Sequence, residues 1–376
     1  MKFVISSTEL LSHLLSVSRV INSKNTLPIL DNFLFSLQEN DLEITASDLE
    51  STLITRIHLV NASKSGKVAI PARLLTDTLK EFPDQPLTFE VNTGNNSIVI
   101  NSENGQFTIM GQNGDEFPRM VNIKEEQKIT LDVDSEILLS GINKTLFATA
   151  DDELRPVMNG ILIELSPDDL SFVASDAHKL VRYKRADGKS EGVASFILPK
   201  KPAALLKNIL PKQDAPVQLE FDSKNAFFQL TDYTLVCRLV EGNYPAYNTV
   251  IPIENPNKLQ IDRVDFYNAL KRVSVFSNQA SNLVKLQLKG NQVLISAQDI
   301  DFSISAYERL NCQYEGDEME IGFKSTFLIE ILSNLSTPEI ILELSDPTRA
   351  GLILPASPAN SNEDVLMLLM PMMINV

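Results

Sequence analysis

The sequence of 376 residues contains no tryptophan, two cysteines, three histidines and only 14 glycines. Cys237 and Cys312 lack the spacing of a metal site and cannot build a disulfide framework, which favours a reducing, cytoplasmic location. So few glycines leave little material for a glycine-rich nucleotide loop. No stretch approaches the roughly 18 apolar residues of a membrane helix. The N-terminal segment carries Glu9 and His13 inside its apolar part, so we interpret it as a strand and an amphipathic helix, not a signal peptide.

The net charge is −16, from 33 basic and 49 acidic residues. As a sum, it counts against a nucleic-acid partner, because such affinity comes largely from neutralising phosphates. Where the charges lie along the chain therefore matters more than their total.

The chain repeats itself with a period of roughly 125 residues. Each repeat opens with an alternating strand, continues with an amphipathic helix, and then has two further strands. The third strand ends in Ala-Ser-Asp or Ala-Gln-Asp, at Asp48, Asp176 and Asp299. A strand, a turn, a helix and more alternating strands follow in the back half of every repeat. The sequence therefore predicts an α+β fold with six βαβββ half-units in three domains, at residues 1–122, 127–250 and 256–376.

The helices predicted by this pattern are basic compared with the rest of the chain. They span 8–24, 72–83, 134–147, 200–213, 263–277 and 324–335, and together carry a net charge of +6, which leaves −22 elsewhere. This distribution predicts helices facing a polyanion through weak, sequence-independent phosphate contacts. No base-reading motif or stacking aromatic accompanies the charges. The residues predicted to face DNA are Lys24, Arg73, Lys80, Lys144, Lys200, Lys201, Lys207 and Lys271. For any single one, an ordinary solvated surface charge is the alternative.

Motifs along the whole chain carry a family resemblance. The first repeat contains MKFVI, TLPIL, SDLE and VAIPAR, the second contains ASDAHKL and LVEG before Tyr244 and Pro245, and the third contains MEIGF and LLMPM. In this order they resemble the bacterial DNA polymerase III beta subunit, the sliding clamp. Ala177 and Lys179 stand where glycine and arginine are common in that family, and the chain continues past Met372 with a longer, uncharged end.

The resemblance implies a head-to-tail homodimer that closes into a ring around duplex DNA, with helices lining the hole and antiparallel sheets outside. The ring confers processivity and has no cofactor, metal or catalytic residue. The implied partners are double-stranded DNA, the catalytic subunit of the replicative polymerase, the clamp loader, repair polymerases, ligase and mismatch-repair proteins.

The resemblance also implies two further surfaces. A hydrophobic pocket for linear peptides falls on Met158, Ser175, Ala177, His178, Lys179, Leu180, Pro245, Val250, Leu368, Met370, Pro371 and Met372. The dimer interface falls on Phe107 and Ile109 against Val275 and Phe276. Methionines adapt to different apolar side chains, which suits a site with many partners. Without the resemblance, simple core packing would be the favoured interpretation of these residues.

The sequence also allows other interpretations of the protein's function. A non-encircling scaffold with the same fold and pocket is the main alternative. An enzyme is disfavoured, because Ser175, Asp176 and His178 lie side by side on one strand end, whereas catalytic triads come from separated segments. The acidic run 151–153 could hold a hard cation, but a solvated loop is the simpler reading.

Overall fold

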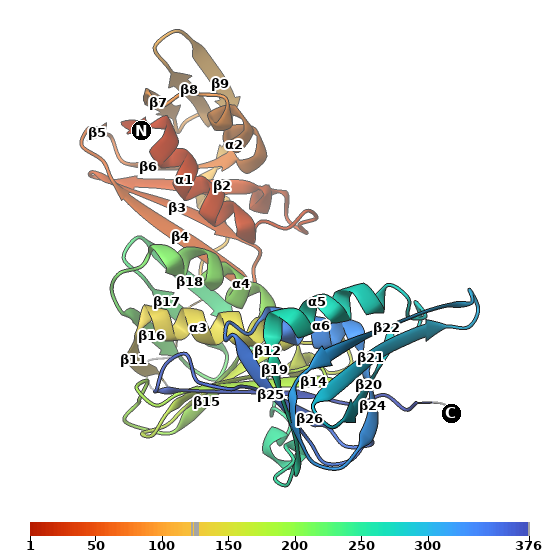
Figure 1. Cartoon of the computed structure of the whole chain (residues 1–376). Coiled ribbons are helices and arrows are strands. Elements are labelled where there is room, and N and C mark those ends of the chain that lie inside the picture. The colour runs from red at the N-terminus through yellow and green to blue at the C-terminus, as the bar shows by residue number, and fades with distance from the viewer. Residues whose placement is uncertain (122, 124–127, 375–376) are drawn as a thin grey trace. The chain divides into compact units, whose positions relative to one another are not determined.

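The computed structural model describes residues 1–121, 123 and 128–374. Its internal contacts divide the chain into two compact units, Met1–Leu139 with Lys201–Leu239, and Ser140–Lys200 with Val240–Val376. The predicted domain borders at 122, 127 and 376 lie outside the described residues. Every strand pair recorded is antiparallel, and α-helices pack on the sheets, which confirms the α+β prediction (Figure 1).

The described residues of the first unit form two sheets. The smaller has the order β5 (Ala62–Ser63), β1 (Lys2–Ser6), β7 (Pro86–Asn92), β8 (Ser97–Asn101), β9 (Gln106–Met110). The larger has the order β10 (Gln112–Asn113), β6 (Gly66–Pro71), β2 (Asn32–Gln38), β3 (Asp41–Ser47), β4 (Ser51–His58), β18 (Tyr233–Arg238), β17 (Asn225–Gln229), β16 (Val217–Phe221), β11 (Ile129–Val133).

Two further sheets form in the second unit, as far as residue 374. The larger has the order β15 (Ala194–Pro199), β12 (Gly160–Leu165), β13 (Leu170–Ser175), β14 (Lys179–Arg185), β27 (Glu363–Leu369), β26 (Gly351–Pro355), β25 (Glu339–Leu344), β19 (Asn257–Asp262), β23 (Gln313–Glu315). The smaller has the order β22 (Ile304–Asn311), β21 (Gln292–Asp299), β20 (Leu283–Lys289), β24 (Met319–Lys324).

An α-helix lies inside five of the six predicted ranges, and the first begins one residue before the predicted 8–24 and ends at Val17. They are α1 (Ser7–Val17), α2 (Ala72–Lys80), α3 (Ser135–Thr145), α4 (Lys200–Ile209), α5 (Arg263–Ser274) and α6 (Ser325–Ser333). Short 3₁₀ turns lie at η1 (Ser18–Val20), η2 (Pro28–Asp31), η3 (Gly114–Glu116), η5 (Leu146–Ala148), η6 (Pro156–Met158), η7 (Leu210–Lys212) and η8 (Tyr247–Val250). Helix α1 packs beside α2, and α5 beside α6 (Figure 1).

Local sequence explains these elements. Strand β2, NFLFSLQ, buries Phe33, Phe35 and Leu37 because every second side chain points to the core. Helix α5 begins where the Asp262 carboxylate accepts a hydrogen bond from the Asp265 amide at 2.8 Å, which satisfies a free helix-end donor. Amphipathic α2 buries Leu75 and Leu79 on one face.

The units do not follow the repeats, because the sheets continue from one repeat into the next. In the first unit, β4 of the first repeat pairs with β18 of the second, from Tyr233 opposite Thr55 to Cys237 opposite Ser51. In the second unit, β14 of the second repeat pairs with β27 of the third. Each large sheet is therefore shared by two repeats.

The repeated aspartate has a structural role in each repeat. Oδ1 of Asp48 accepts hydrogen bonds from the amides of Glu50 and Ser51, and Oδ1 of Asp176 does so from His178 and Lys179. Asp299 binds the amides two and three residues ahead in the same way. A carboxylate that binds its own backbone ahead closes a tight turn, which accounts for the residue at these matched positions.

Candidate functional site

The residues predicted to form a peptide pocket all belong to the second unit. Ser175 ends β13, Lys179 and Leu180 begin β14, and Leu368 lies in β27. The pairing of β14 with β27 sets Leu180 opposite Leu368. Strand ends that are almost 190 residues apart in the sequence therefore meet at one edge of the site.

Leu180 and Leu368 belong to one apolar cluster. Its other buried members are Leu162, Val173, Ile197, Tyr247, Ala350, Leu352 and Leu366, with Val157, Val240, Tyr244, Ile251 and Leu354 packed against it. Met158 is also buried, whereas Val250 is 56% exposed and Met370 is 41% exposed. Exposed Val250 and Met370 thus lie in the same unit as this cluster, and exposed apolar side chains can bind those of a partner.

The turn from 175 to 179 is rigidly built. Burial alone would raise the pKa of Asp176, but hydrogen bonds from the Lys179 ammonium and from the amides of Lys179 and His178 hold that pKa below its usual value. The Ser175 hydroxyl donates to the Lys179 carbonyl at 2.8 Å. Ala177 has φ +74°, a left-handed conformation that favours glycine.

Lys179 is only 5% exposed and is held by two carboxylates. Its Nζ lies 2.8 Å from Asp176 and 3.1 Å from Glu330 of α6, and 4.5 Å from the centre of the Phe327 ring. The His178 ring stacks on the same phenyl ring at 5.8 Å. Thus α6 of the third repeat contacts and holds a turn of the second.

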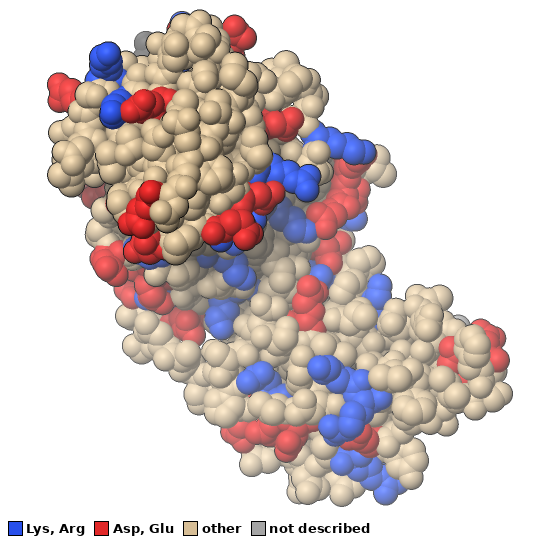
Figure 2. Space-filling model, turned by 90° about the horizontal axis from the view of Figure 1, so that it is seen from above, with Lys and Arg blue, Asp and Glu red and all other residues tan. Residues whose placement is uncertain are grey.

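The residues predicted to face DNA have different surroundings. Lys24, Lys207 and Lys271 are exposed, and Arg73 has a side chain that is 96% exposed. Lys80 pairs with Asp77 at 3.0 Å and Lys200 with Asp151 at 2.7 Å, both near the surface. Figure 2 shows basic side chains intermixed with acidic ones on the viewed face.

Two of the eight basic residues are engaged inside the protein. Nζ of Lys201 donates to the Val20 carbonyl at 2.5 Å, to Asn22 at 2.6 Å and to the buried carboxylate of Asp48 at 2.5 Å. Lys144 is half-buried, and desolvation lowers its pKa. The side chain of Lys201 therefore has a structural role in the first unit.

The residues predicted for a dimer interface lie at element ends or on a sheet edge. Phe107 is 40% exposed on the edge strand β9, where its ring meets Phe82 edge-on at 5.2 Å, while Ile109 is buried. Val275 and Phe276 follow α5 and are 73% and 37% exposed. Three of the four residues are thus accessible.

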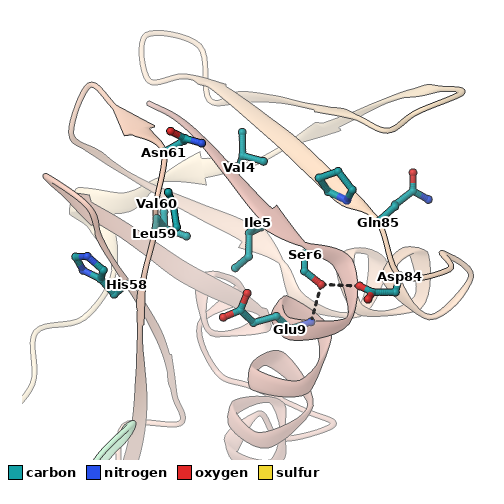
Figure 3. A pocket seen from close by; sticks show the side chains of 11 residues that line it. Val4, Ile5, Ser6, Glu9, His58, Leu59, Val60, Asn61, Asp84 and Gln85 are labelled. Atoms are coloured by element: carbon teal, nitrogen blue, oxygen red, sulfur yellow. Dashed lines mark hydrogen bonds between the residues drawn. The ribbon is translucent and has the colours of Figure 1, made fainter.

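A separate hollow of about 490 Å³ lies in the first unit, beside the end of β1 (Figure 3). Apolar Val4, Ile5 and Leu59 share its lining with polar groups, and the Ser6 hydroxyl donates to Asp84 at 2.7 Å. None of the predicted site residues lines this hollow.

Comparison with known proteins decides the family. Family models of the DNA polymerase III beta subunit match its N-terminal domain at residues 1–121, its central domain at 132–246 and its C-terminal domain at 248–373. The beta sliding clamp of Proteus mirabilis is 31% identical over 348 residues, 92% of this chain and 94% of that protein. The chain belongs to the DNA polymerase III beta subunit family.

Other sliding clamps agree with this assignment. The protein of Escherichia coli K12 is 29% identical over 347 residues, 92% of this chain and 93% of that one. The sliding clamp of Pseudomonas aeruginosa bound to griselimycin superposes with a TM-score of 0.93 at 27% identity, and the beta subunit of Thermotoga maritima with 0.90 at 26%. Both comparisons cover 100% of each chain. The clamp fold is therefore present along the whole chain.

Members of this family are non-catalytic subunits of DNA polymerase III, with DNA and polymerase as partners. In the described part of this clamp, no group of three or more His, Cys, Asp or Glu residues could hold a metal ion. In the acidic run 151–153, Asp151 pairs with Lys200 and Asp152 with Arg155. No helix among the described residues is long and apolar enough to cross a membrane.

The sequence does not indicate several residues that lie around the predicted pocket. Phe327 and Glu330 contact the 178–179 turn, and Tyr247, whose hydroxyl donates to Glu164 at 2.6 Å, lies in the apolar cluster. The alternating strands of the second and third repeats signal the cluster's leucines. Nothing local signals Phe327 or Glu330, because they come from a different repeat.

Proposed function

We propose that the chain forms a head-to-tail homodimeric ring that encircles duplex DNA and tethers the replicative polymerase through the pocket in its second unit. The match of the whole chain to solved sliding clamps carries this proposal. The three domains, at about residues 1–122, 127–250 and 256–376, would then give a ring of six similar domains. The cytoplasm is the proposed location.

The sheet edges support a head-to-tail interface. Strand β9 is the last strand of the small sheet in the first unit, and β22 is the last strand of the small sheet in the second. An edge strand presents unpaired backbone groups that can pair with another chain. Because the candidate surfaces come from different parts of the chain, their contact is heterologous, and such a contact can close into a ring. Phe107, Ile109, Val275 and Phe276 are the proposed interface residues.

Duplex DNA would be held by encirclement and by loose phosphate contacts. The exposed members of the predicted set, such as Lys24, Arg73, Lys207 and Lys271, suit this role, because long solvated side chains attract phosphates without reading bases. Weak contacts of this kind permit sliding.

The pocket would take short linear peptides from the polymerase, the clamp loader, repair polymerases, ligase and mismatch-repair proteins. Its support is the buried cluster around Leu180 and Leu368, together with exposed Val250 and Met370. A chain lacking residues 370–376 is expected to lose binding of a fluorescein-labelled peptide from the polymerase catalytic subunit in an anisotropy titration, while remaining a dimer. A scrambled peptide is the control, and unchanged affinity would contradict the pocket.

Retention on DNA tests encirclement. After loading by its clamp loader, the protein is expected to remain on nicked circular DNA through gel filtration and to be lost when the circle is cut once. Equal loss from both forms would favour a scaffold that does not encircle DNA. Light scattering at micromolar concentration is expected to give twice the chain mass of 41.8 kDa, and a monomer would count against the ring.

A further inference from the structure

The C-terminal segment after β27 is tied to the second unit at two points. The Met370 amide donates to the His178 carbonyl at 2.9 Å, and the Met372 amide donates to the Gly322 carbonyl at 2.8 Å. Pro371, between them, has no amide hydrogen. Every backbone donor from 370 to 372 is therefore used.

The second tie joins the segment to a sheet edge. Strand β24, which contains Gly322, is the last strand of the small sheet in this unit and pairs with β20 on its other side. Met372 forms an isolated antiparallel bridge with Gly322. The segment thus pairs with the open edge of β24 through a single residue.

Gly322 makes this approach possible. A Cβ atom at position 322 would lie 2.9 Å from the Met372 carbonyl oxygen, 3.0 Å from Cγ1 of Ile374 and 2.8 Å from Cδ1 of Leu283. Its φ is not in the left-handed region, so space and not backbone conformation requires glycine there. The Leu283 side chain could move aside, but the Met372 contact is with backbone, so an added methyl group has to push the segment away from β24.

We propose that Gly322 is a positioning residue for the peptide pocket. By leaving room for the segment on β24, it holds residues 370–372 beside the 178–180 turn, where the Met370 amide binds the His178 carbonyl and Leu180 belongs to the apolar cluster. Gly322 acts through the segment and does not contact the peptide. This inference rests on the proposed peptide-binding function.

Hydrogen exchange on the full-length protein tests the docking itself. In Gly322→Ala, the amide of Met372 is expected to exchange about tenfold faster than in the wild type, because the segment is pushed away from the Gly322 carbonyl that accepts its hydrogen bond, while amides of β24 and β27 keep their protection. Gly192→Ala is the matched control, since nothing lies within 4 Å of a Cβ there. Equal Met372 exchange in the wild type and Gly322→Ala would overturn the inference.

Peptide titration tests the consequence. Gly322→Ala is expected to bind the labelled polymerase peptide about fivefold more weakly, which corresponds to the net contribution of roughly one hydrogen bond. Gly192→Ala is expected to bind it like the wild type. Faster Met372 exchange with unchanged affinity would overturn the positioning role. If the wild type itself does not bind the peptide, the proposed pocket is wrong. The exchange result then still tests whether the C-terminal segment is docked on β24.

A second pair of variants covers the case in which Gly322→Ala does not fold. Met372→Pro and Met372→Ala both remove the thioether side chain, but only the proline also removes the amide hydrogen bonded to Gly322. The proline variant is expected to bind the peptide about fivefold more weakly than the alanine variant. Equal affinities would contradict the proposal.

Discussion

Replacing Lys201 by methionine is expected to destabilise the first unit strongly. The ammonium has three donors, and three acceptors take them at 2.5–2.6 Å, namely the Val20 carbonyl, the Asn22 side chain and the Asp48 carboxylate. Methionine keeps most of the aliphatic volume, so the change tests the polar contacts and little else.

The magnitude follows from burial. Removing one partner of a buried ion pair costs about 3–5 kcal/mol, because the remaining charge is left without compensation. Here the Asp48 side chain is 5% exposed, but that of Lys201 is 35% exposed, and Asp48 keeps its bonds to the Glu50 and Ser51 amides. We therefore expect a loss of about 2 kcal/mol, below that range.

The neighbouring lysine provides the control. Lys200 pairs with Asp151 at 2.7 Å, but the two side chains are 42% and 80% exposed, so Lys200→Met is expected to cost at most about 0.5 kcal/mol. Guanidinium unfolding followed by circular dichroism measures both losses, and hydrogen exchange of residues 41–58 reports on the first unit directly. Similar losses for the two variants would refute the argument that Lys201 is mainly structural.

Further predictions concern the second unit and the thiols. Lys179→Met is expected to lower the free energy of unfolding by about 2 kcal/mol at pH 7, because Asp176 and Glu330 lose their cation. The pKa of folded Asp176 lies below its usual value, so the Asp176 part of this stabilisation is present above about pH 4 and is lost as the pH falls through the lower folded pKa. A stability difference between wild type and Lys179→Met that is the same at pH 2.5 as at pH 7 would contradict this. Lys324→Met, which removes a cation 4.7 Å from the Phe327 ring, is the control in the same unfolding assay. Ala177→Gly is expected to stabilise by about 0.5 kcal/mol, as relief of left-handed strain outweighs backbone entropy, and a loss of stability in thermal unfolding would refute this. Burial raises the pKa of Cys237 to about 12, so a thiol reagent at pH 8 should modify Cys312 in the native protein and Cys237 only after denaturation, and two fast-reacting native thiols would contradict it.

The sequence predicts the repeated elements well because their signals are local. Alternation gives strands such as β2, leucines three and four apart give helices such as α2, and the matched aspartates mark the turns at 48, 176 and 299. The resemblance supplies the pocket residues, of which Leu180 and Leu368 fall in one cluster. These parts require no knowledge of distant contacts.

The sequence does not predict contacts between residues that lie far apart in the chain. From the sequence, Lys201 is expected to be an ordinary surface charge, but the groups that accept its hydrogen bonds lie more than 150 residues earlier in the chain. Glu330 and Phe327 contact Lys179 from a different repeat. Glycine is required at 322 because the C-terminal segment lies close to it on β24. A count of charges or glycines cannot reveal such pairings.

The shared sheets also determine where a clamp of this kind can yield to mechanical load. Separating the first repeat from the second would break the five residue pairs of β4 with β18, and separating the second from the third would break the seven pairs of β14 with β27. Cross-strand side-chain pairs stabilise a sheet, so either separation loses the contribution of every pair in its ladder. In the proposed ring, a loader that opens it would therefore part the contact between the two chains and leave these two ladders intact.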